Sequence, residues 1–268
     1  MSLKKFKKRL QFNKRFEIYH PSGIYTGSIG YLSQYSSPEI FLLTFGEKLL
    51  IYNSSGKLKQ EIPFTNKVCK LFITENLIPG KKVFVSLAYS GEIRVFSETG
   101  EIFWKIKNGR LVDGVLGNLD YDPKMEIVSL NENNQILIYN DTGKIVAKYT
   151  HPSKIYYITL AKLNSSEKNV ILFVDSNDKL HVLDIETQIS EIPLGVKSIQ
   201  GLDSLTIYNT NVVVILDSKN FVNIYDKKGN LIERFSPEKE VESIFTGYLE
   251  NDKIESLFLI TKDSYLVN

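Results

Sequence analysis

The chain has 268 residues, of which 43% are hydrophobic and 24% are charged, the balance of a globular protein with a substantial core. Its 33 Lys and Arg residues nearly cancel its 31 Asp and Glu residues, so the formal net charge of +2 gives no argument for nucleic acid binding. One cysteine excludes an intramolecular disulfide, and no apolar run is long enough to span a membrane. We therefore expect a cytoplasmic protein.

The N-terminal segment is strongly basic, with seven Lys and Arg residues between positions 4 and 15 and no apolar run of the kind found in a signal peptide. Such a run could contact an anionic membrane surface or nucleic acid. However, Leu10, Phe12, Phe16 and Ile18 alternate like the inner face of a strand. We expect residues 1–9 to form a loose basic tail ahead of that strand, and we expect no nucleic acid partner.

Five similar segments recur along the chain: LLIYNSSGKL (49–58), IRVFSETGEI (93–102), ILIYNDTGK (136–144), HVLDIETQI (181–189) and NIYDKKGNL (223–231). Their matching positions are Gly56, Gly100, Gly143, Thr187 and Gly229, which are separated by 44, 43, 44 and 42 residues. A steady internal period of this length is typical of solenoids and β-propellers.

Each segment has the composition of a β-hairpin. In the third one, β-forming residues lead into Asn140, two turn residues and Gly143, after which an alternating strand resumes. Asn or Asp at the first turn position bonds its own backbone, and glycine at the fourth adopts the left-handed conformation that closes the turn. The predicted turns begin at Asn53, Ser97, Asn140, Asp184 and Asp226.

Two further apolar segments precede each hairpin, so that every period contains four short strands, here named A to D. The B strands are EIFLL (39–43), KVFVSL (82–87), MEIVSL (125–130), NVILFV (169–174) and NVVVIL (211–216). Four short strands per period, with no long helical pattern, predict the blade of a β-propeller.

The two ends of the chain complement each other. Residues 241–268 supply strands A, B and C of a blade, whereas residues 16–32 resemble residues 147–163, a D strand followed by the next A strand. Sharing a blade between the two ends removes exposed sheet edges. The sequence therefore predicts an all-β fold, a six-bladed propeller of four-stranded antiparallel blades, with 1–268 as one domain closed by an N-terminal D strand.

The blades resemble those of several propeller repeat families. GNLDYDPKMEIVSL (117–130) is similar to the FG-GAP repeat of integrin-α-type propellers, and VFSETGEIFWKI (95–106) resembles the quinoprotein-type repeat. The blade length is also that of WD-repeat proteins, although the chain has no Trp-Asp dipeptide. These resemblances imply binding and scaffolding more often than catalysis.

The third blade contains a candidate calcium loop. Asn118, Asp120, Asp122 and Glu126 occupy positions 1, 3, 5 and 9 of a short segment, and oxygen ligands at such spacing can converge on Ca²⁺. FG-GAP repeats carry a similar loop. The alternative is an acidic solvated turn, which Pro123 favours because it occupies a position where glycine usually permits the tight turn. Calcium is the only cofactor that the sequence suggests.

The loops from each D strand to the next A strand carry basic residues at nearly the same offset. We expect them to surround one mouth of the central channel, where a positive potential would attract a protein or acidic peptide partner. Acidic residues in the B–C loops of the same face (Glu47, Glu132, Asp175, Asp178, Asp217 and Asp263) would dilute that potential, as on a mixed solvated surface. Gly23 interrupts the series, whose members are Lys67, Arg110, Lys154, Lys197 and Lys239.

The histidines, His20, His151 and His181, have no metal-ligand spacing, so a metal site built from them requires the fold to bring them together. The chain also lacks the short motifs of nucleotide binding and of hydrolases. We therefore expect a non-catalytic protein-interaction scaffold, alone or as a subunit of a larger complex.

Two alternatives remain open. A metal-dependent hydrolase or lyase would use the inner ends of the A strands, and a calcium-binding FG-GAP-like module would use the acidic loop of the third blade. The sequence places these residues at the inner positions: Thr26, Lys70, Asp113, Tyr157, Gln200 and Glu242.

Overall fold

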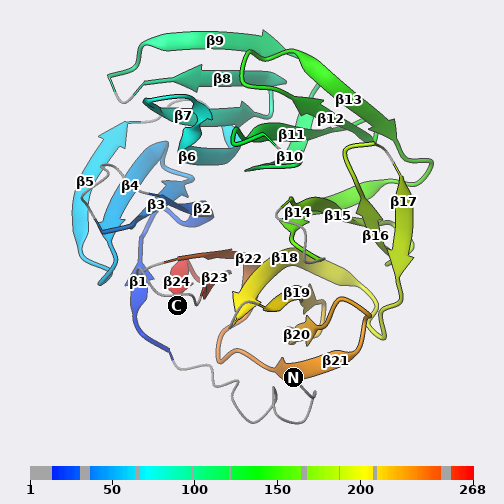
Figure 1. Ribbon diagram of the computed structural model, residues 1–268. Coiled ribbons are helices and arrows are strands. Elements are labelled where there is room, and N and C mark those ends of the chain that lie inside the picture. The colour runs from blue at the N-terminus through cyan, green and yellow to red at the C-terminus, as the bar shows by residue number, and fades with distance from the viewer. Residues whose placement is uncertain are drawn as a thin grey trace.

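The computed structural model describes residues 14–30, 37–63, 67–97, 99–120, 122–163, 168–186, 188–207, 210–248 and 255–268. The described residues form 24 strands and no helix. The strands make six four-stranded antiparallel sheets, which surround a common centre as the blades of a propeller (Figure 1). The predicted fold is therefore confirmed.

Blades 1 and 2 consist of β2 (Ile24–Gly30), β3 (Glu39–Thr44), β4 (Lys48–Asn53), β5 (Leu58–Pro63), β6 (Val68–Ile78), β7 (Lys81–Ala88), β8 (Glu92–Phe96) and β9 (Ile102–Lys107). Blades 3 and 4 consist of β10 (Leu111–Gly117), β11 (Glu126–Asn131), β12 (Gln135–Tyr139), β13 (Ile145–Thr150), β14 (Ile155–Ala161), β15 (Val170–Asp175), β16 (Leu180–Leu183) and β17 (Ile189–Ile192). Blades 5 and 6 consist of β18 (Ile199–Ile207), β19 (Thr210–Asp217), β20 (Val222–Tyr225), β21 (Leu231–Phe235), β22 (Val241–Gly247), β23 (Ser256–Thr261), β24 (Tyr265–Val267) and β1 (Glu17–Tyr19).

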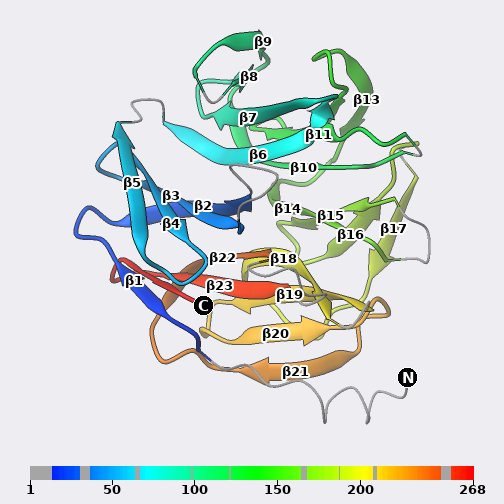
Figure 2. The ribbon, with the colours of Figure 1, turned by 60° about the vertical axis from the view of Figure 1, so that its left-hand side comes forward.

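The N-terminal strand closes the ring. β1 pairs antiparallel with β24, with Glu17 opposite Val267 and Tyr19 opposite Tyr265. Ile18 is buried in the same core cluster as Phe258 and Leu266 of blade 6. The predicted closure by a shared blade is confirmed, and the turned view shows β1 beside the C-terminal strands (Figure 2).

The inner strands β2, β6, β10, β14, β18 and β22 line the centre, and each contacts the inner strand of the next blade around the full circle. Every inner strand has a register shift at its second residue, as between Val68 and Lys70 or between Ile155 and Tyr157. A β-bulge bends a strand and redirects its side chains. The mouth of the channel is therefore lined by a repeated bulge position.

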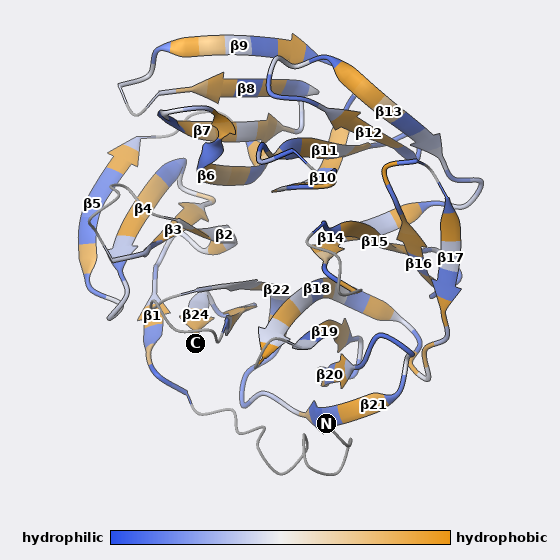
Figure 3. Cartoon of the chain, in the orientation of Figure 1, coloured by the Kyte–Doolittle hydropathy of each residue, from blue (hydrophilic) through white to orange (hydrophobic). Residues whose placement is uncertain are grey.

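The hydrophobic core lies between successive blades. All residues of β3 and β11 are buried because a neighbouring blade covers each face of these sheets. The outer D strands have one face in solvent, and exposed and half-buried residues alternate in the last four positions of β9 and β13. β9, β13 and β21 each contain hydrophobic and hydrophilic residues (Figure 3). Each D strand of blades 1 to 5 starts with an exposed aliphatic residue: Leu58, Ile102, Ile145, Ile189 and Leu231.

The predicted C–D turns are present. Asn53 Oδ1 accepts hydrogen bonds from the amides of Ser55 at 3.2 Å and Lys57 at 2.8 Å, and Asn140 repeats this arrangement. The closing glycines adopt φ angles near +80°, a conformation open to glycine because it has no Cβ. Thr187, the predicted exception, lies outside the described residues.

A second set of turns joins strands B and C at the other end of the blades. One residue of each adopts positive φ, and in three blades its side chain binds the next blade: Asn134 accepts from the amide of Ile155, Asp178 from Ile199, and Asn220 from Val241. These side chains act as polar links between neighbouring blades. The six positions are Glu47, Gly91, Asn134, Asp178, Asn220 and Ser264.

Candidate functional site

One backbone hydrogen bond occurs in every blade and defines which loop positions are equivalent. The amide that follows the B strand donates to a carbonyl in the D–A loop, as Tyr89 does to Lys67 at 3.1 Å. The bond joins the B–C turns to the D–A loops, so both lie at the same end of the ring, as expected from the sequence. The accepting residues are Gly23, Lys67, Arg110, Lys154, Ser198 and Glu240.

The predicted ring of five equivalent cations is therefore corrected. Lys67, Arg110 and Lys154 are equivalent, whereas Lys197 and Lys239 lie one residue before Ser198 and Glu240, which occupy the matching positions. The reason is loop length, because residues 193–198 and 236–240 separate the strands where most other D–A loops have four residues or fewer. The basic residues in register belong to the consecutive blades 2, 3 and 4.

The three equivalent cations also differ from Lys239 in their surroundings. Lys67, Arg110 and Lys154 are exposed, and none of them pairs with a carboxylate among the described residues. Lys239 lies 3.4 Å from Asp263, 3.7 Å from Glu17 and over the ring of Tyr265. Its charge is therefore largely compensated within blade 6.

Exposed aromatic and aliphatic residues accompany the three cations. Phe45 is 65% exposed, Tyr89 and Tyr156 are each 42% exposed, and Val112 is 37% exposed. Phe45 and Tyr89 follow their B strands at equivalent positions, and Val112 and Tyr156 occupy the bulges of β10 and β14. The matching residues of blades 5 and 6 are polar: Ser218, Lys262, Gln200 and Glu242.

These residues lie at the same end of the consecutive blades 1 to 4, and we name the set the mouth arc. Lys154 Nζ lies 5.1 Å from the ring centre of Tyr156, and the ring of Phe45 lies 5.2 Å from that of Tyr25. Burial raises the pKa of Tyr25 to about 12 and also raises that of Tyr89, so both phenols are neutral. The mouth arc consists of Phe45, Lys67, Tyr89, Arg110, Val112, Lys154 and Tyr156.

The acidic residues of this face neutralise less of the positive charge of the mouth arc than the sequence suggests. Asp175 and Asp217 are buried, and Asp217 contacts Arg234 at 3.4 Å. Asp178 accepts hydrogen bonds from the first amides of β18, and Asp263 lies beside Lys239. The exposed carboxylates left at the B–C turns are Glu47 and Glu132.

Inside the channel, the inner strands bring two pairs of polar side chains together. Lys70 Nζ lies 3.5 Å from Asp113 Oδ1, and this carboxylate raises the pKa of Lys70. Thr159 donates a hydrogen bond of 2.7 Å to Asp203, whose pKa is raised by burial. Both pairs join residues of different blades, so they also stabilise the ring.

The bulges change which residues occupy the inner positions. Thr26, Lys70, Asp113 and Tyr157 are equivalent, but in blades 5 and 6 the matching residues are Gly201 and Ser243. The sequence placed Gln200 and Glu242 there, and that placement is wrong because both residues stand on the bulges. The pair of inner carboxylates expected for a hydrolase or lyase therefore loses Glu242.

The candidate calcium loop brings three of its four residues together. Carboxylate oxygens of Asp120, Asp122 and Glu126 lie within 4.8 Å of one another. Asp120 accepts from the amide of Asp122, and Glu126 accepts from the amide of Leu119, each at 2.7 Å. Burial, opposed in part by that amide and assisted by both aspartates, raises the pKa of Glu126 to about 7. Calcium binding here stays a prediction.

The side-chain amide of Asn118 is turned toward the backbone of the same loop, where its Nδ2 donates a hydrogen bond to the carbonyl of Asp122. The backbone carbonyl of Asn118 accepts a hydrogen bond of 2.9 Å from the backbone amide of Asn169 in blade 4. Asn118 therefore has a structural role between two blades, in addition to its place in the predicted ligand set.

Two of the three histidines meet in blade 4, which the sequence pattern did not predict. His151 and His181 lie beside Asp175, and all three side chains are buried. His20 occupies the position equivalent to His151 in another blade and accepts from the amide of Ser22. The signal in the sequence was weak. His181 is one polar residue in a short apolar strand, and Asp175 is the last residue of the strand before it.

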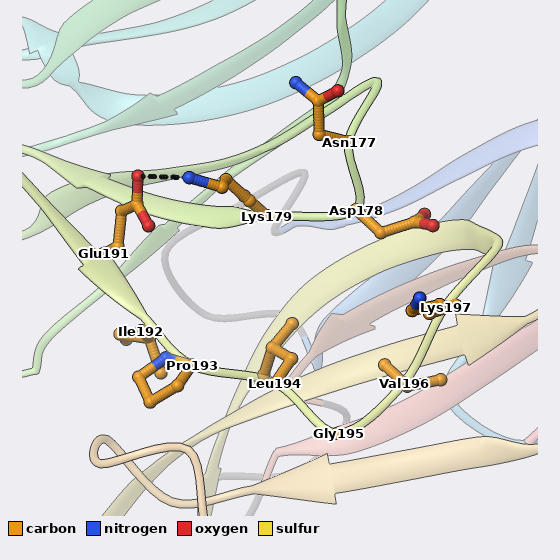
Figure 4. A pocket seen from close by; sticks show the side chains of 10 residues that line it. All are labelled: Asn177, Asp178, Lys179, Glu191, Ile192, Pro193, Leu194, Gly195, Val196 and Lys197. Atoms are coloured by element: carbon orange, nitrogen blue, oxygen red, sulfur yellow. Dashed lines mark hydrogen bonds and ion pairs between the residues drawn. The ribbon is translucent and has the colours of Figure 1, made fainter.

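A pocket of about 400 Å³ lies at the mouth end of the same blade, between the B–C turn at residues 177–179, the end of β17 and the loop that leads to β18 (Figure 4). Its walls include Lys179 and Glu191, which form an ion pair of 3.1 Å, and the segment 192–196. Lys197 also lines it, so this predicted cation faces the pocket and is separate from the mouth arc.

No helix among the described residues is long and apolar enough to cross a membrane. No protein family model and no curated protein matches the chain. Its fold is similar to that of two crystal structures of BBS1N in complex with ARL6DN, one soaked with mercury and one with lead. The first has a TM-score of 0.68 and 13% identity and covers 95% of both chains. The second has a TM-score of 0.64 and 15% identity and covers 95% of this chain and 94% of the other.

Proposed function

We propose that this chain is a non-catalytic protein-interaction scaffold that binds a protein or acidic peptide partner through the mouth arc. The observation that carries the proposal is that exposed cations without an ion pair among the described residues stand with an exposed aromatic or aliphatic residue in each of the consecutive blades 2, 3 and 4. Tyr, Phe and Arg are enriched at protein interfaces, where the aromatic rings bury large areas and Arg makes several directed hydrogen bonds. The exposed aliphatic residues at the start of the D strands recur in five blades. They are therefore a feature of the repeat and do not distinguish one binding face.

The rigid frame favours this use. Hydrogen bonds join each D–A loop to a B–C turn, and Asn134, Asp178 and Asn220 join neighbouring blades. Loops held in place before binding lose little conformational entropy on binding. BBS1N, which shares the fold, was crystallised in complex with ARL6DN, and this supports a protein partner for a propeller of this kind. We further propose that the chain acts in the cytoplasm, alone or within a larger assembly.

Affinity capture tests the proposal. The arc variant Lys67→Glu/Arg110→Glu/Lys154→Glu is compared with Lys105→Glu/Lys144→Glu/Lys148→Glu, which makes the same charge change at exposed positions on the outer strands or beside them. We expect the arc variant to recover its partner at least about tenfold less well, because like charges now face an acidic partner. Equal recovery by both variants and the wild type would contradict the proposal.

A further inference from the structure

The buried cluster in blade 4 joins residues from two blades. His151 follows β13 of blade 3, Asp175 ends β15, and His181 is the second residue of β16. Both imidazoles approach the same carboxylate oxygen, since His151 Nε2 lies 3.4 Å and His181 Nε2 3.2 Å from Asp175 Oδ2. The exposed fractions are 7% for His151, 2% for Asp175 and 3% for His181.

His181 lacks the hydrogen bonds that a buried imidazole normally has. Neither Nδ1 nor Nε2 has a hydrogen-bond partner among the described residues, because the approach of Nε2 to Asp175 is not aligned for one. Phe173 stacks on its ring with the ring centres 4.7 Å apart, and Glu191 Oε1 lies 3.9 Å from Nδ1, too far for a hydrogen bond. Buried polar atoms in folded proteins nearly always have a partner, so two such atoms point to a missing ligand.

Both imidazole nitrogens lie farther from Asp175 Oδ2 than a strong hydrogen bond requires, and of the two only His151 Nε2 is aligned to make one, at 3.4 Å. Charge-assisted hydrogen bonds of this type are about 2.7–2.9 Å long. Ligands bound at about 2.0–2.1 Å to a tetrahedral Zn²⁺ lie about 3.3–3.4 Å apart. The two nitrogen-to-oxygen distances of 3.2 and 3.4 Å match that second value.

Neighbouring groups hold the ligands in place. Asp175 Oδ1 accepts from the backbone amides of Asn177 at 2.9 Å and Lys179 at 3.1 Å. Asp175 Oδ2 accepts from Asn177 Nδ2 at 3.2 Å and lies beside both histidines. Tyr149 Oη lies 3.0 Å from His151 Nδ1, an outer contact that orients the ring so that Nε2 faces Asp175 Oδ2.

Blade 5 has the same turn, but the side chains around it do not form a set of metal ligands. Asp217 ends its B strand as Asp175 does, but there Asn223 Nδ2 donates to Asp217 Oδ2 at 3.1 Å, and Arg234 contacts the same oxygen at 3.4 Å. At the matching positions of blade 4, His181 replaces Asn223 and Glu191 replaces Arg234. Blade 4 therefore has an imidazole and a carboxylate where blade 5 has two hydrogen-bond donors, and Asn177 Nδ2 is the side-chain amide that donates to Asp175 Oδ2.

We propose that His151 Nε2, Asp175 Oδ2 and His181 Nε2 bind one divalent transition metal ion, with Zn²⁺ as the expected occupant. Imidazole and carboxylate ligands suit Zn²⁺, and the three protein ligands leave a fourth position for water. Because His151 belongs to the segment after blade 3, the ion links two blades. The site is separate from the mouth arc, so it does not depend on the proposed function.

Isothermal titration of chelator-treated protein with ZnCl₂ tests the site. We expect one Zn²⁺ per chain for the wild type. His181→Asn, which copies the residue present in blade 5, should weaken Zn²⁺ binding more than about 100-fold, because removing a ligand exceeds the effect of removing an outer contact. His20→Asn changes a histidine in the equivalent loop of another blade and should bind like the wild type.

The outcomes are distinct. Zn²⁺ should raise the melting temperature of the wild type and of His20→Asn, and should leave that of His181→Asn unchanged. Circular dichroism establishes that His181→Asn is folded, and His151→Gln replaces it in the titration if it is not. Binding of no Zn²⁺ by the wild type, or unchanged affinity in the folded ligand variant, would overturn the proposal and leave a buried polar cluster.

Discussion

The amide of Tyr89 donates a hydrogen bond of 3.1 Å to the carbonyl of Lys67. Through this bond, an aromatic residue that follows a B strand stands beside a cation that precedes an A strand, both exposed at the channel mouth. The same bond recurs in all six blades, but the pairing of exposed apolar and basic side chains occurs on one side of the ring. This asymmetry is the basis of the proposed binding face.

Asn220 should be one of the most sensitive polar residues of the ring. Its Oδ1 accepts from the amide of Val241 at 2.8 Å, its Nδ2 donates to the carbonyl of Lys239 at 2.9 Å, and its φ is 62°. Asn220→Ala loses both bonds and strains the left-handed backbone, so we expect a loss of about 3 kcal/mol in the free energy of unfolding.

The matched variant Asn220→Asp keeps the acceptor, as Asp178 does in blade 4, and should lose about 1 kcal/mol or less. Urea denaturation measures both values. If the two variants were equally stable, the side chain of Asn220 would not link blades 5 and 6.

Two glycines with similar backbone angles should tolerate alanine very differently. At Gly91 (φ 91°) a Cβ would lie 1.8 Å from the carbonyl oxygen of Gly109, whereas at Gly100 (φ 86°) nothing lies within 4 Å. We expect Gly91→Ala to lose about 3 kcal/mol or more and Gly100→Ala about 1 kcal/mol, the strain of the left-handed backbone alone. Thermal unfolding of the two variants side by side measures the difference, and similar melting temperatures would contradict it.

Glu255 should make stability depend on pH. Burial, opposed by hydrogen bonds from Thr206, raises its pKa from 4.5 to about 7. The folded state therefore binds more protons than the unfolded state between these values, and stability is lost as the pH rises from about 4.5 through about 7. Glu255→Gln should make the melting temperature depend less on pH between about 4.5 and about 7. Glu126, whose pKa is also raised to about 7, acts in the same direction, so Glu126→Gln/Glu255→Gln should weaken that dependence further.

Calcium should stabilise the third blade if Asp120, Asp122 and Glu126 hold it. A ligand at 100 times its dissociation constant adds about 2.7 kcal/mol to stability, so excess Ca²⁺ should raise the melting temperature relative to excess chelator. Glu126→Gln should abolish the difference while keeping an oxygen acceptor for the amide of Leu119. A melting temperature insensitive to both Ca²⁺ and chelator would identify the loop as an acidic turn.

The repeat could be predicted from the sequence because it depends on local chemistry. Asn140 and Gly143 determine a turn by their own backbone preferences, and the spacing of such turns predicts the blade. The closure by β1 was also predictable, since it depends on which strands are missing at each end. Burial of B strands on both faces follows from their continuous apolar runs.

The candidate sites depended on features that a sequence pattern does not contain. Lys197 and Lys239 left the series because their loops are longer, and Glu242 moved to a bulge because each inner strand contains an extra residue. His151 meets His181 only through the packing of blade 3 against blade 4. The mouth arc likewise combines residues from two loops of each blade, which the backbone hydrogen bonds join.

The most direct test of the mouth arc is photo-crosslinking with p-benzoylphenylalanine placed at Tyr89 or at Ile102. The two positions are similarly exposed, at 42% and 46%, but Ile102 lies beside a C–D turn at the opposite end of the blade. The proposal predicts that the captured partner crosslinks at position 89 and not at position 102. Crosslinking at position 102 alone, or equally at both positions, would contradict it.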